Sequence, residues 1–204
     1  MPENRAISVA DPGPLGLAAF ALTTFLLSLS NAGILAGTGP NIVIPVALLY
    51  GGAVQVAAGM FEFFNRNTFG ATAFASYGAF WMAYAGVFLF PGVASALGPN
   101  SVPFFLLGWT IFTFYMMVGS LRLNGALTTT FILLFLAFVA LTIGAFGHAE
   151  LTKIGGGLGI LTAIAAWYTS AAGILNGVYG RVVLPVGPYQ TSARAAAAAA
   201  METD

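Results

Sequence analysis

The chain has 204 residues, of which 59% are hydrophobic and only 6% are charged, and its formal net charge is +0. A soluble domain carries about 25% charged residues, so this composition excludes an ordinary water-soluble fold and predicts an integral membrane protein. A neutral chain offers no electrostatic attraction to nucleic acid, and the absence of Cys excludes disulfides and thiolate metal sites.

Six apolar runs follow one another along the chain, and each has about the 20 residues that cross a bilayer as a helix. They span residues 14–36, 42–64, 68–90, 102–121, 126–146 and 154–179. The runs are continuously apolar and lack the alternation of membrane β-strands. We therefore predict an all-α integral membrane protein with six transmembrane helices, the first of them a retained helix rather than a cleaved signal.

The basic residues indicate the direction of these helices. Five arginines fall on one side of a six-span arrangement and one lysine falls on the other: Arg5, Arg66, Arg122, Arg181 and Arg194 against Lys153. Cytoplasmic connections retain Lys and Arg, so both termini are expected in the cytoplasm. Residues 1–13 then form a cytoplasmic N-terminal segment, residues 14–187 the membrane domain, and residues 188–204 a low-complexity cytoplasmic tail.

Ionisable side chains are nearly absent from the predicted spans. Glu62 is the only acid inside one, and a local pair with Arg66, four residues on, is favoured over a proton relay. His148 lies in a predicted loop beside Glu150, without a second ligand for a metal. Paired aspartates and a Ser-His pair are missing from the spans, so we predict no cofactor, no metal and no enzyme activity.

Uncharged polar residues are the groups that the spans do contain. Candidates for a polar pathway are Thr23, Thr24 and Asn31 in the first span, Gln55 in the second and Thr130 in the fifth. Interhelical hydrogen bonding would explain any one of them. Together they suit a path that releases a small anion or weak acid quickly.

Glycines at GxxxG spacing indicate close helix packing. The pairs are Gly33 with Gly37, Gly155 with Gly159, and Gly173 with Gly177. They favour tight association within or between protomers and say nothing about a substrate.

Several motifs resemble one family of membrane transporters. The run Asp11-Pro12-Gly13-Pro14-Leu15-Gly16-Leu17 is similar to the Asn-Pro-Ala-Pro-Leu-Gly-Leu signature of the acetate uptake transporter family, the succinate-acetate permeases. Three further stretches match in order: Tyr50-Gly51-Gly52 with Gln55 and Glu62, Asn67-Thr68-Phe69-Gly70 leading to Ser76-Tyr77-Gly78 and Phe80-Trp81, and Gly180-Arg181-Val182-Val183-Leu184-Pro185. Asp11 replaces the family's usual Asn and places a negative charge at the expected entrance.

The resemblance implies a homohexamer with one pathway and one narrow constriction in each protomer. The constriction residues match Phe20, Tyr77 and Leu134, which lie about 7 to 10 residues into the first, third and fifth spans and so share one depth. Ala166 is expected on the facing part of the sixth span. Gln55 and the Tyr77 hydroxyl are expected to replace water around a carboxylate.

The function that this implies is a channel or proton-coupled transporter for acetate, and also for succinate, in the plasma membrane. Its partners would be a small mono- or dicarboxylate, protons and the lipid bilayer. Channel and symport use the same residues, so both remain open. An ammonia channel and a non-transporting membrane scaffold are the alternatives.

Overall fold

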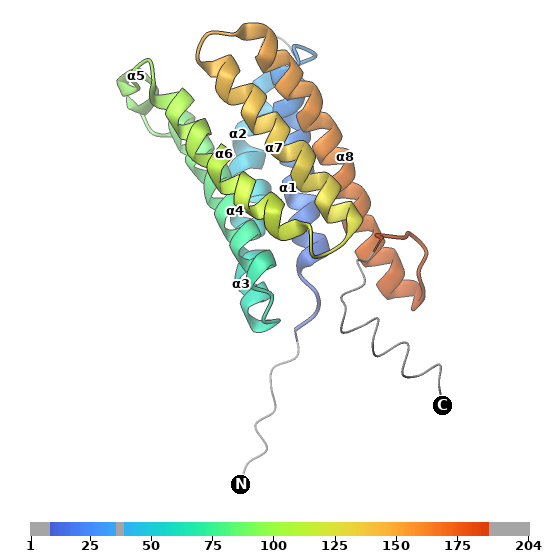
Figure 1. Ribbon diagram of the computed structural model, residues 1–204. Coiled ribbons are helices and arrows are strands. Elements are labelled where there is room, and N and C mark those ends of the chain that lie inside the picture. The colour runs from blue at the N-terminus through green and yellow to red at the C-terminus, as the bar shows by residue number, and fades with distance from the viewer. Residues whose placement is uncertain (1–8, 36–38, 188–204) are drawn as a thin grey trace, which may run out of the picture.

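The computed structural model describes residues 9–35 and 39–187 of the chain, and every regular element in these ranges is helical. In chain order the elements are α1 (Gly13–Asn31), η1 (Gly39–Ile42), α2 (Val43–Leu48), η2 (Leu49–Val54), α3 (Gln55–Phe64), α4 (Thr68–Leu89), α5 (Val93–Ala96), α6 (Ser101–Ser120), α7 (Gly125–Ala145) and α8 (Ala149–Tyr179) (Figure 1). This confirms the all-α prediction. Arg5, Gly37, Arg194 and the predicted tail lie outside the described residues.

Five helical segments among the described residues are long and apolar enough to cross a membrane. They are α1, the continuous stretch Val43–Phe64, α6, α7 and α8. α4 is also long, with 22 residues, but it is not one of these five segments. Integral membrane insertion through several helices is therefore supported, while the count of six spans stays a prediction.

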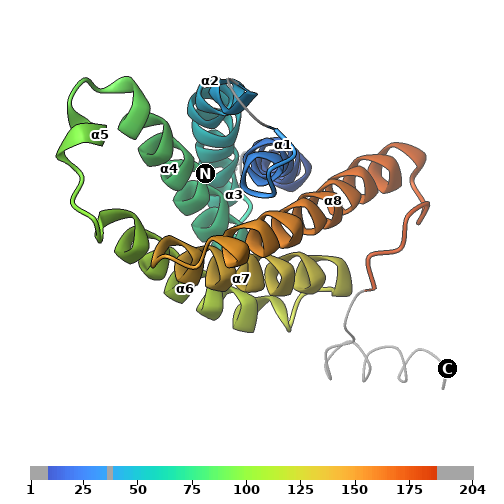
Figure 2. The same ribbon diagram turned by 90° about the horizontal axis from the view of Figure 1, so that it is seen from above.

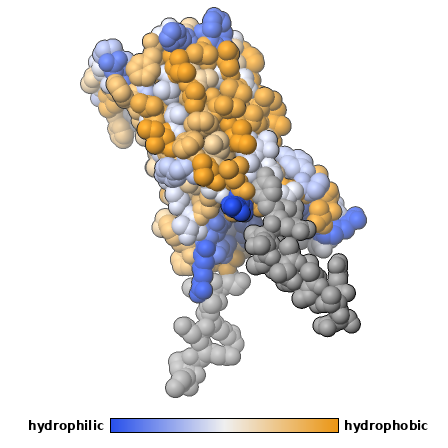
Figure 3. All heavy atoms as spheres, in the orientation of Figure 1, coloured by the Kyte–Doolittle hydropathy of each residue, from blue (hydrophilic) through white to orange (hydrophobic). Residues whose placement is uncertain are grey.

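The long helices run alongside one another in a bundle. α8 packs along both α1 and α7, α6 packs on α7, and α4 packs on α3 (Figures 1 and 2). Large apolar side chains on the outside, such as Phe104 and Ile111 of α6, are exposed. Figure 3 shows hydrophobic residues over the middle of the visible face and hydrophilic ones toward both ends, which is the pattern that a bilayer requires.

The second predicted span is not one continuous α-helix. A π-helical stretch, η2, separates α2 from α3. Its two glycines permit close approach of neighbouring helices, because a Cβ on Gly51 would contact Thr23 of α1 and a Cβ on Gly52 would contact Met82 of α4. A π-helical turn is a frequent feature of functional sites, and hydrophobic periodicity does not reveal it.

Two helix ends differ from the predictions. α1 ends at Asn31 rather than near residue 36, because Gly33 adopts a left-handed conformation (φ 77°) and the N–H of Ile34 donates to the Leu29 carbonyl at 2.9 Å. Gly33 therefore ends the helix instead of packing against another one. α8 begins at Ala149, five residues before the predicted 154.

The early start of α8 changes the surroundings of the predicted loop residues. Glu150 lies in the first helical turn, and its carboxylate pairs with Lys153 at 3.0 Å on the exposed surface. Acidic side chains near a helix N-terminus interact favourably with the helix dipole. The prediction that Glu150 lies in a loop is therefore wrong.

The other predicted glycine pairs pack within the protomer or face open space. A Cβ on Gly155 would contact Leu141 of α7, whereas one on Gly159 would contact Ser28 of α1. Gly173 lies against Pro14, and Gly177 has no neighbouring atom within 4 Å. The observed contacts of these glycines are therefore contacts between helices of one chain.

Candidate functional site

Two cavities follow one another along the helices. The first, called here the lower cavity, has a volume of about 430 Å³ and is lined by the start of α1, both ends of α3, the starts of α4 and α7 and the later half of α8. The second, the upper cavity, has a volume of about 420 Å³ and is lined by the later halves of α1, α4 and α7 and the start of α6. Each has room for several water molecules or a small organic solute.

Three side chains line both cavities: Phe20 of α1, Tyr77 of α4 and Leu134 of α7. All three are buried, and the Phe20 and Tyr77 ring centroids are 5.8 Å apart. We call this set the collar. The structure therefore brings together the three residues that the sequence grouped by depth and by family resemblance.

The Tyr77 side chain is held from the α6 side. Its hydroxyl is 2.9 Å from the Oγ1 of Thr113, and its ring makes an edge-to-face contact with Phe112 at 5.2 Å. Thr113 is fully buried. The hydroxyl is thus engaged with α6, which differs from the expectation that it would replace water around a carboxylate.

Gln55 is the clearest unpaired polar group of the lower cavity. The side chain is fully buried, and neither Oε1 nor Nε2 has a hydrogen-bond partner among the described residues. It is the first residue of α3, directly after the π-helical stretch, and lines the cavity. Buried polar groups are nearly always paired, so an unpaired donor and acceptor on one side chain of the cavity wall are unusual.

The upper cavity contains two further unpaired groups. Thr24 Oγ1 and Trp81 Nε1 are buried without a partner, and both residues line this cavity together with Asn31. Thr23 behaves differently, because its hydroxyl donates to the Ala19 carbonyl at 2.9 Å and the residue lines neither cavity. The structure thus brings Thr24 and Asn31 to a cavity and leaves Thr23 in helix packing.

Only part of the predicted entrance motif lines the lower cavity. Asp11, Gly13, Pro14 and Leu17 line the lower cavity, whereas Pro12, Leu15 and Gly16 do not. The Asp11 carboxylate accepts from the N–H of Gly13 at 2.9 Å, which forms a local turn before α1 instead of an N-cap, since Pro12 is the N-cap residue. Leu15 is exposed, and a Cβ on Gly16 would contact the Phe74 ring.

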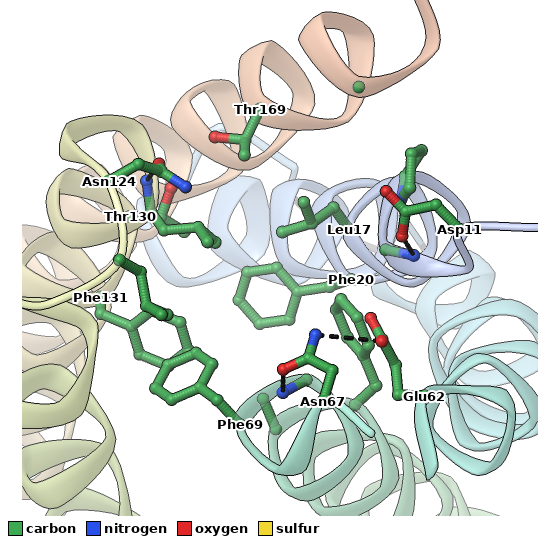
Figure 4. Close-up of a pocket in the computed structure, with 18 of the residues that line it drawn as sticks. Asp11, Leu17, Phe20, Glu62, Asn67, Phe69, Asn124, Thr130, Phe131 and Thr169 are labelled. Carbon is green, nitrogen blue, oxygen red and sulfur yellow. Dashed lines mark hydrogen bonds between the residues drawn. The ribbon is translucent and has the colours of Figure 1, made fainter. Parts of the chain in front are cut away.

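The predicted pair between Glu62 and Arg66 is wrong. Asn67 Nδ2 donates to Glu62 Oε2 at 3.0 Å, and Asn67 Oδ1 accepts from the N–H of Gly70 at 3.0 Å (Figure 4). α3 ends at Phe64 and Arg66 has a left-handed backbone (φ 55°), so residues 62 and 66 no longer share a helix face. Asn67 therefore both caps α4 and fixes Glu62 in the cavity wall.

Thr130 and Ala166 occupy contrasting places. Thr130 lines the lower cavity on the side opposite Asp11 and Glu62 (Figure 4), and its hydroxyl donates to the Ala126 carbonyl at 3.0 Å. Ala166 is fully buried in the same apolar cluster as the collar but lines neither cavity. It packs behind the collar rather than facing the cavities.

The described lining of both cavities includes no Lys, Arg or His. His148 is exposed at the start of α8. Within residues 9–35 and 39–187, no group of three or more His, Asp or Glu side chains is arranged to hold a metal ion. A carboxylate in either cavity would therefore meet no fixed cation, and in the lower cavity it would share the space with the carboxyl groups of Asp11 and Glu62.

Sequence reasoning did not assign four cavity residues to the pathway. Trp81 contributes an unpaired N–H to the upper cavity, and Asn67, Asn124 and Asn176 line the lower one. Asn124 Oδ1 caps α7 by accepting from the N–H of Leu127 at 2.9 Å. An Asn directly before an apolar run is a signal for such a cap, but its position on a cavity wall depends on the tertiary fold.

The chain is similar to proteins named for organic acid transport. It is 44% identical over 212 residues to acetate permease A of Emericella nidulans, covering 94% of this chain and 71% of that protein. It is 37% identical over 182 residues to the succinate-acetate/proton symporter SatP of Escherichia coli, covering 88% and 96%. Ammonia transport outward protein 2 of Saccharomyces cerevisiae is 41% identical over 174 residues, covering 81% of this chain and 61% of the yeast protein.

A solved structure has the same fold. The structure of the bacterial acetate channel SatP superposes with a TM-score of 0.83 at 37% identity, covering 88% of this chain and 100% of that one. The model of the GPR1/FUN34/yaaH family matches residues 2–190. On its sequence and its fold, the chain is a member of the GPR1/FUN34/yaaH family.

Proposed function

We propose that the chain is a membrane channel or proton-coupled transporter for acetate, and that the substrate moves between the lower and upper cavities through the collar. The observation that carries this proposal is that Phe20, Tyr77 and Leu134 line both cavities. A solute that passes from one cavity to the other would pass these side chains. The names of the relatives supply the substrate, and succinate is included because one of them is named for it.

The chemistry of the walls supports a small monocarboxylate. Moving a bare carboxylate into an apolar collar costs several kcal/mol unless hydrogen bonds replace its water. Gln55 below the collar, and Thr24 and Trp81 above it, have buried donors without partners. These groups can bind acetate on either side of the collar, and neutral donors release it faster than a fixed cation would.

A proton moving with the substrate would lower the barrier at the collar. Neutral acetic acid has a much smaller desolvation cost than acetate. Among the described residues no basic side chain lines the cavities to balance an anion, and Asp11 and Glu62 line the lower one. We therefore propose that acetate and a proton cross together. Uptake into proteoliposomes with and without an inward proton gradient tests this, and flux that ignores the gradient would favour an uncoupled channel.

Ammonia is the second candidate substrate, because one relative is named for ammonia transport. A narrow apolar collar also admits a small neutral base. Uptake of labelled acetate and of labelled methylammonium, measured in parallel on one proteoliposome preparation, distinguishes acetate from ammonia as the substrate. A protein that transported neither in folded form would instead be a scaffold.

The orientation and assembly complete the proposal. Arg66 after α3, Arg122 after α6 and Arg181 after α8 are exposed near the end of the bundle where α1 begins. We propose that this end faces the cytoplasm, that the six long helical segments span the plasma membrane, and that protomers form a closed hexamer. Thiol labels at Gly98→Cys and Arg122→Cys should react from opposite sides, and native mass should be about six times the 21.0 kDa of one chain.

A further inference from the structure

The segment after α8 folds back to the start of α7. It comprises residues 181–186, called here the strap, and belongs to a motif for which the transport path gives no role. Glycines with left-handed backbones flank it, Gly180 and Gly187, each with φ 62°. Because glycine adopts such conformations without strain, the chain can turn sharply at each end of the strap.

Two side chains of α8 hold the strap. Asn176 Nδ2 donates to the Leu184 carbonyl at 2.9 Å, and Asn176 Oδ1 accepts from the N–H groups of Val183 and Leu184 at 2.7 and 2.9 Å. The Tyr168 hydroxyl donates to the Pro185 carbonyl at 2.7 Å. One amide and one phenol thus satisfy four backbone groups of a segment that has no regular secondary structure.

The far end of the strap is joined to α7. The N–H of Ala126 donates to the Val186 carbonyl at 3.0 Å, and the N–H of Gly125 donates to the Gly187 carbonyl at 2.8 Å. The strap therefore bridges the end of α8 and the start of α7, where the two helices contribute Asn176 and Leu127 to the lower cavity. Val186 lines the same cavity and is half-buried.

We propose that the lower cavity opens between the end of α8 and the start of α7, an opening called here the mouth. The strap is its size-limiting wall, and Asn176 and Tyr168 are the positioning residues that hold the strap there. With the strap in place, Val186 closes the space between α7 and α8. With the strap released from its hydrogen bonds to Asn176 and Tyr168, the mouth widens and bulkier carboxylates reach the collar. This inference rests on the proposed transport function for its substrates.

A substitution at Tyr168 tests the proposal and leaves every residue that lines the cavities unchanged. Tyr168 is 39% exposed and lines neither cavity, so it can affect the mouth only through the strap. Tyr168→Phe removes one hydrogen bond and Asn176→Ala removes three. Tyr179→Phe is the matched control, because Tyr179 is exposed on the same helix and its hydroxyl has no hydrogen bond within the described residues.

The first measurement probes the width of the mouth. The chain has no Cys, so Leu127→Cys gives a single thiol on the cavity wall. This thiol is modified from the proposed cytoplasmic side by two thiosulfonate reagents, one that carries a methyl group and one that carries a bulky group. The rate of modification by the second reagent is called here the bulky rate, and that by the first the methyl rate. Loss of the Tyr168 bond should raise the bulky rate about fivefold, and Asn176→Ala should raise it further. The methyl rate should change less than about twofold in both strap variants, and in Tyr179→Phe both rates should change less than about twofold.

The second measurement is the ratio of succinate to acetate uptake in proteoliposomes. It should rise with the bulky rate in both strap variants and stay constant in Tyr179→Phe. An unchanged bulky rate in folded Tyr168→Phe and Asn176→Ala would overturn the positioning role. A raised bulky rate with an unchanged uptake ratio would show that the strap does not select substrates, and would overturn the proposal too.

The outcomes also separate this inference from the proposed function. If protein with an unaltered strap took up no acetate, the proposed transport function would be overturned. If the bulky rate still rose in the strap variants, the strap would be supported as the wall of the mouth. Helix content and oligomer size show whether Asn176→Ala folds. If it does not fold, the bulky rate and the uptake ratio of Tyr168→Phe test the proposal without it.

Discussion

The ring of Phe20 on α1 lies 5.8 Å from the ring of Tyr77 on α4, and both side chains line the lower and the upper cavity. Leu134 of α7 completes the set of residues that the two cavities share. Unpaired polar groups lie on both sides of this apolar contact, Gln55 below and Thr24 and Trp81 above. On the proposed path, a solute passes Gln55, then the apolar collar, and then Thr24 and Trp81.

Replacing Gln55 with Met should separate stability from function. The amide is fully buried without a partner, so an apolar side chain of similar size removes a desolvation cost of about 1–3 kcal/mol. We expect the protein to unfold at a higher temperature and acetate uptake to fall. A lower unfolding temperature with unchanged uptake would mean that the amide is needed for packing and does not bind the substrate.

Removing the Tyr77 hydroxyl tests whether it contacts the substrate. The hydroxyl is paired with Thr113 on α6, so Tyr77→Phe should lower the stability by about 1 kcal/mol and leave acetate uptake nearly intact. Thermal unfolding and initial uptake rates measure the two effects. If uptake were lost while the fold persisted, the hydroxyl would be acting directly on the carboxylate.

Asn67→Ala should destabilise the protein through the start of α4. The side chain accepts from Gly70 N and donates to Glu62, and loss of such a cap costs about 1 kcal/mol. Asn100→Ala is the control, because Asn100 precedes α6 without a capping hydrogen bond from its side chain. Equal losses of stability in the two variants would contradict this role for Asn67.

Two glycine substitutions should have opposite effects. A Cβ on Gly59 of α3 would run into the backbone of Ala75 on α4, whereas one on Gly157 of α8 has no neighbouring atom within 4 Å. Gly157→Ala should stabilise its helix by about 1 kcal/mol, and Gly59→Ala should destabilise the protein. A stabilising Gly59→Ala would show that α3 and α4 can move apart freely.

Much of the fold could be predicted from hydrophobic run lengths, because lipid forces each span to be a continuous apolar helix. The bounds of α4, α6 and α7 lie within one residue of the predicted runs. The π-helical stretch and the end of α1 at Gly33 were not predicted. They depend on contacts between helices and on backbone conformation, which apolar runs do not report.

The candidate site was predicted in part. The family resemblance identified Phe20, Tyr77 and Leu134, and helix rise gives them a shared depth. The structure places them together. The Glu62 and Arg66 pair was wrong because α3 ends between the two residues. The strap and its contact with Asn176 escaped prediction, because which loop covers which helix end is decided by tertiary packing.

The most direct test of the collar is substrate selection at Leu134 in proteoliposomes, measured as uptake of labelled acetate and labelled lactate. Leu134→Ala should keep acetate uptake and raise the lactate-to-acetate ratio, and Leu134→Trp should block both without altering oligomer size. Leu136→Ala and Leu136→Trp are the controls, since Leu136 is 43% exposed on the same helix and lines neither cavity. Folded Leu134→Ala and Leu134→Trp proteins with unchanged uptake and an unchanged ratio would contradict a path through the collar.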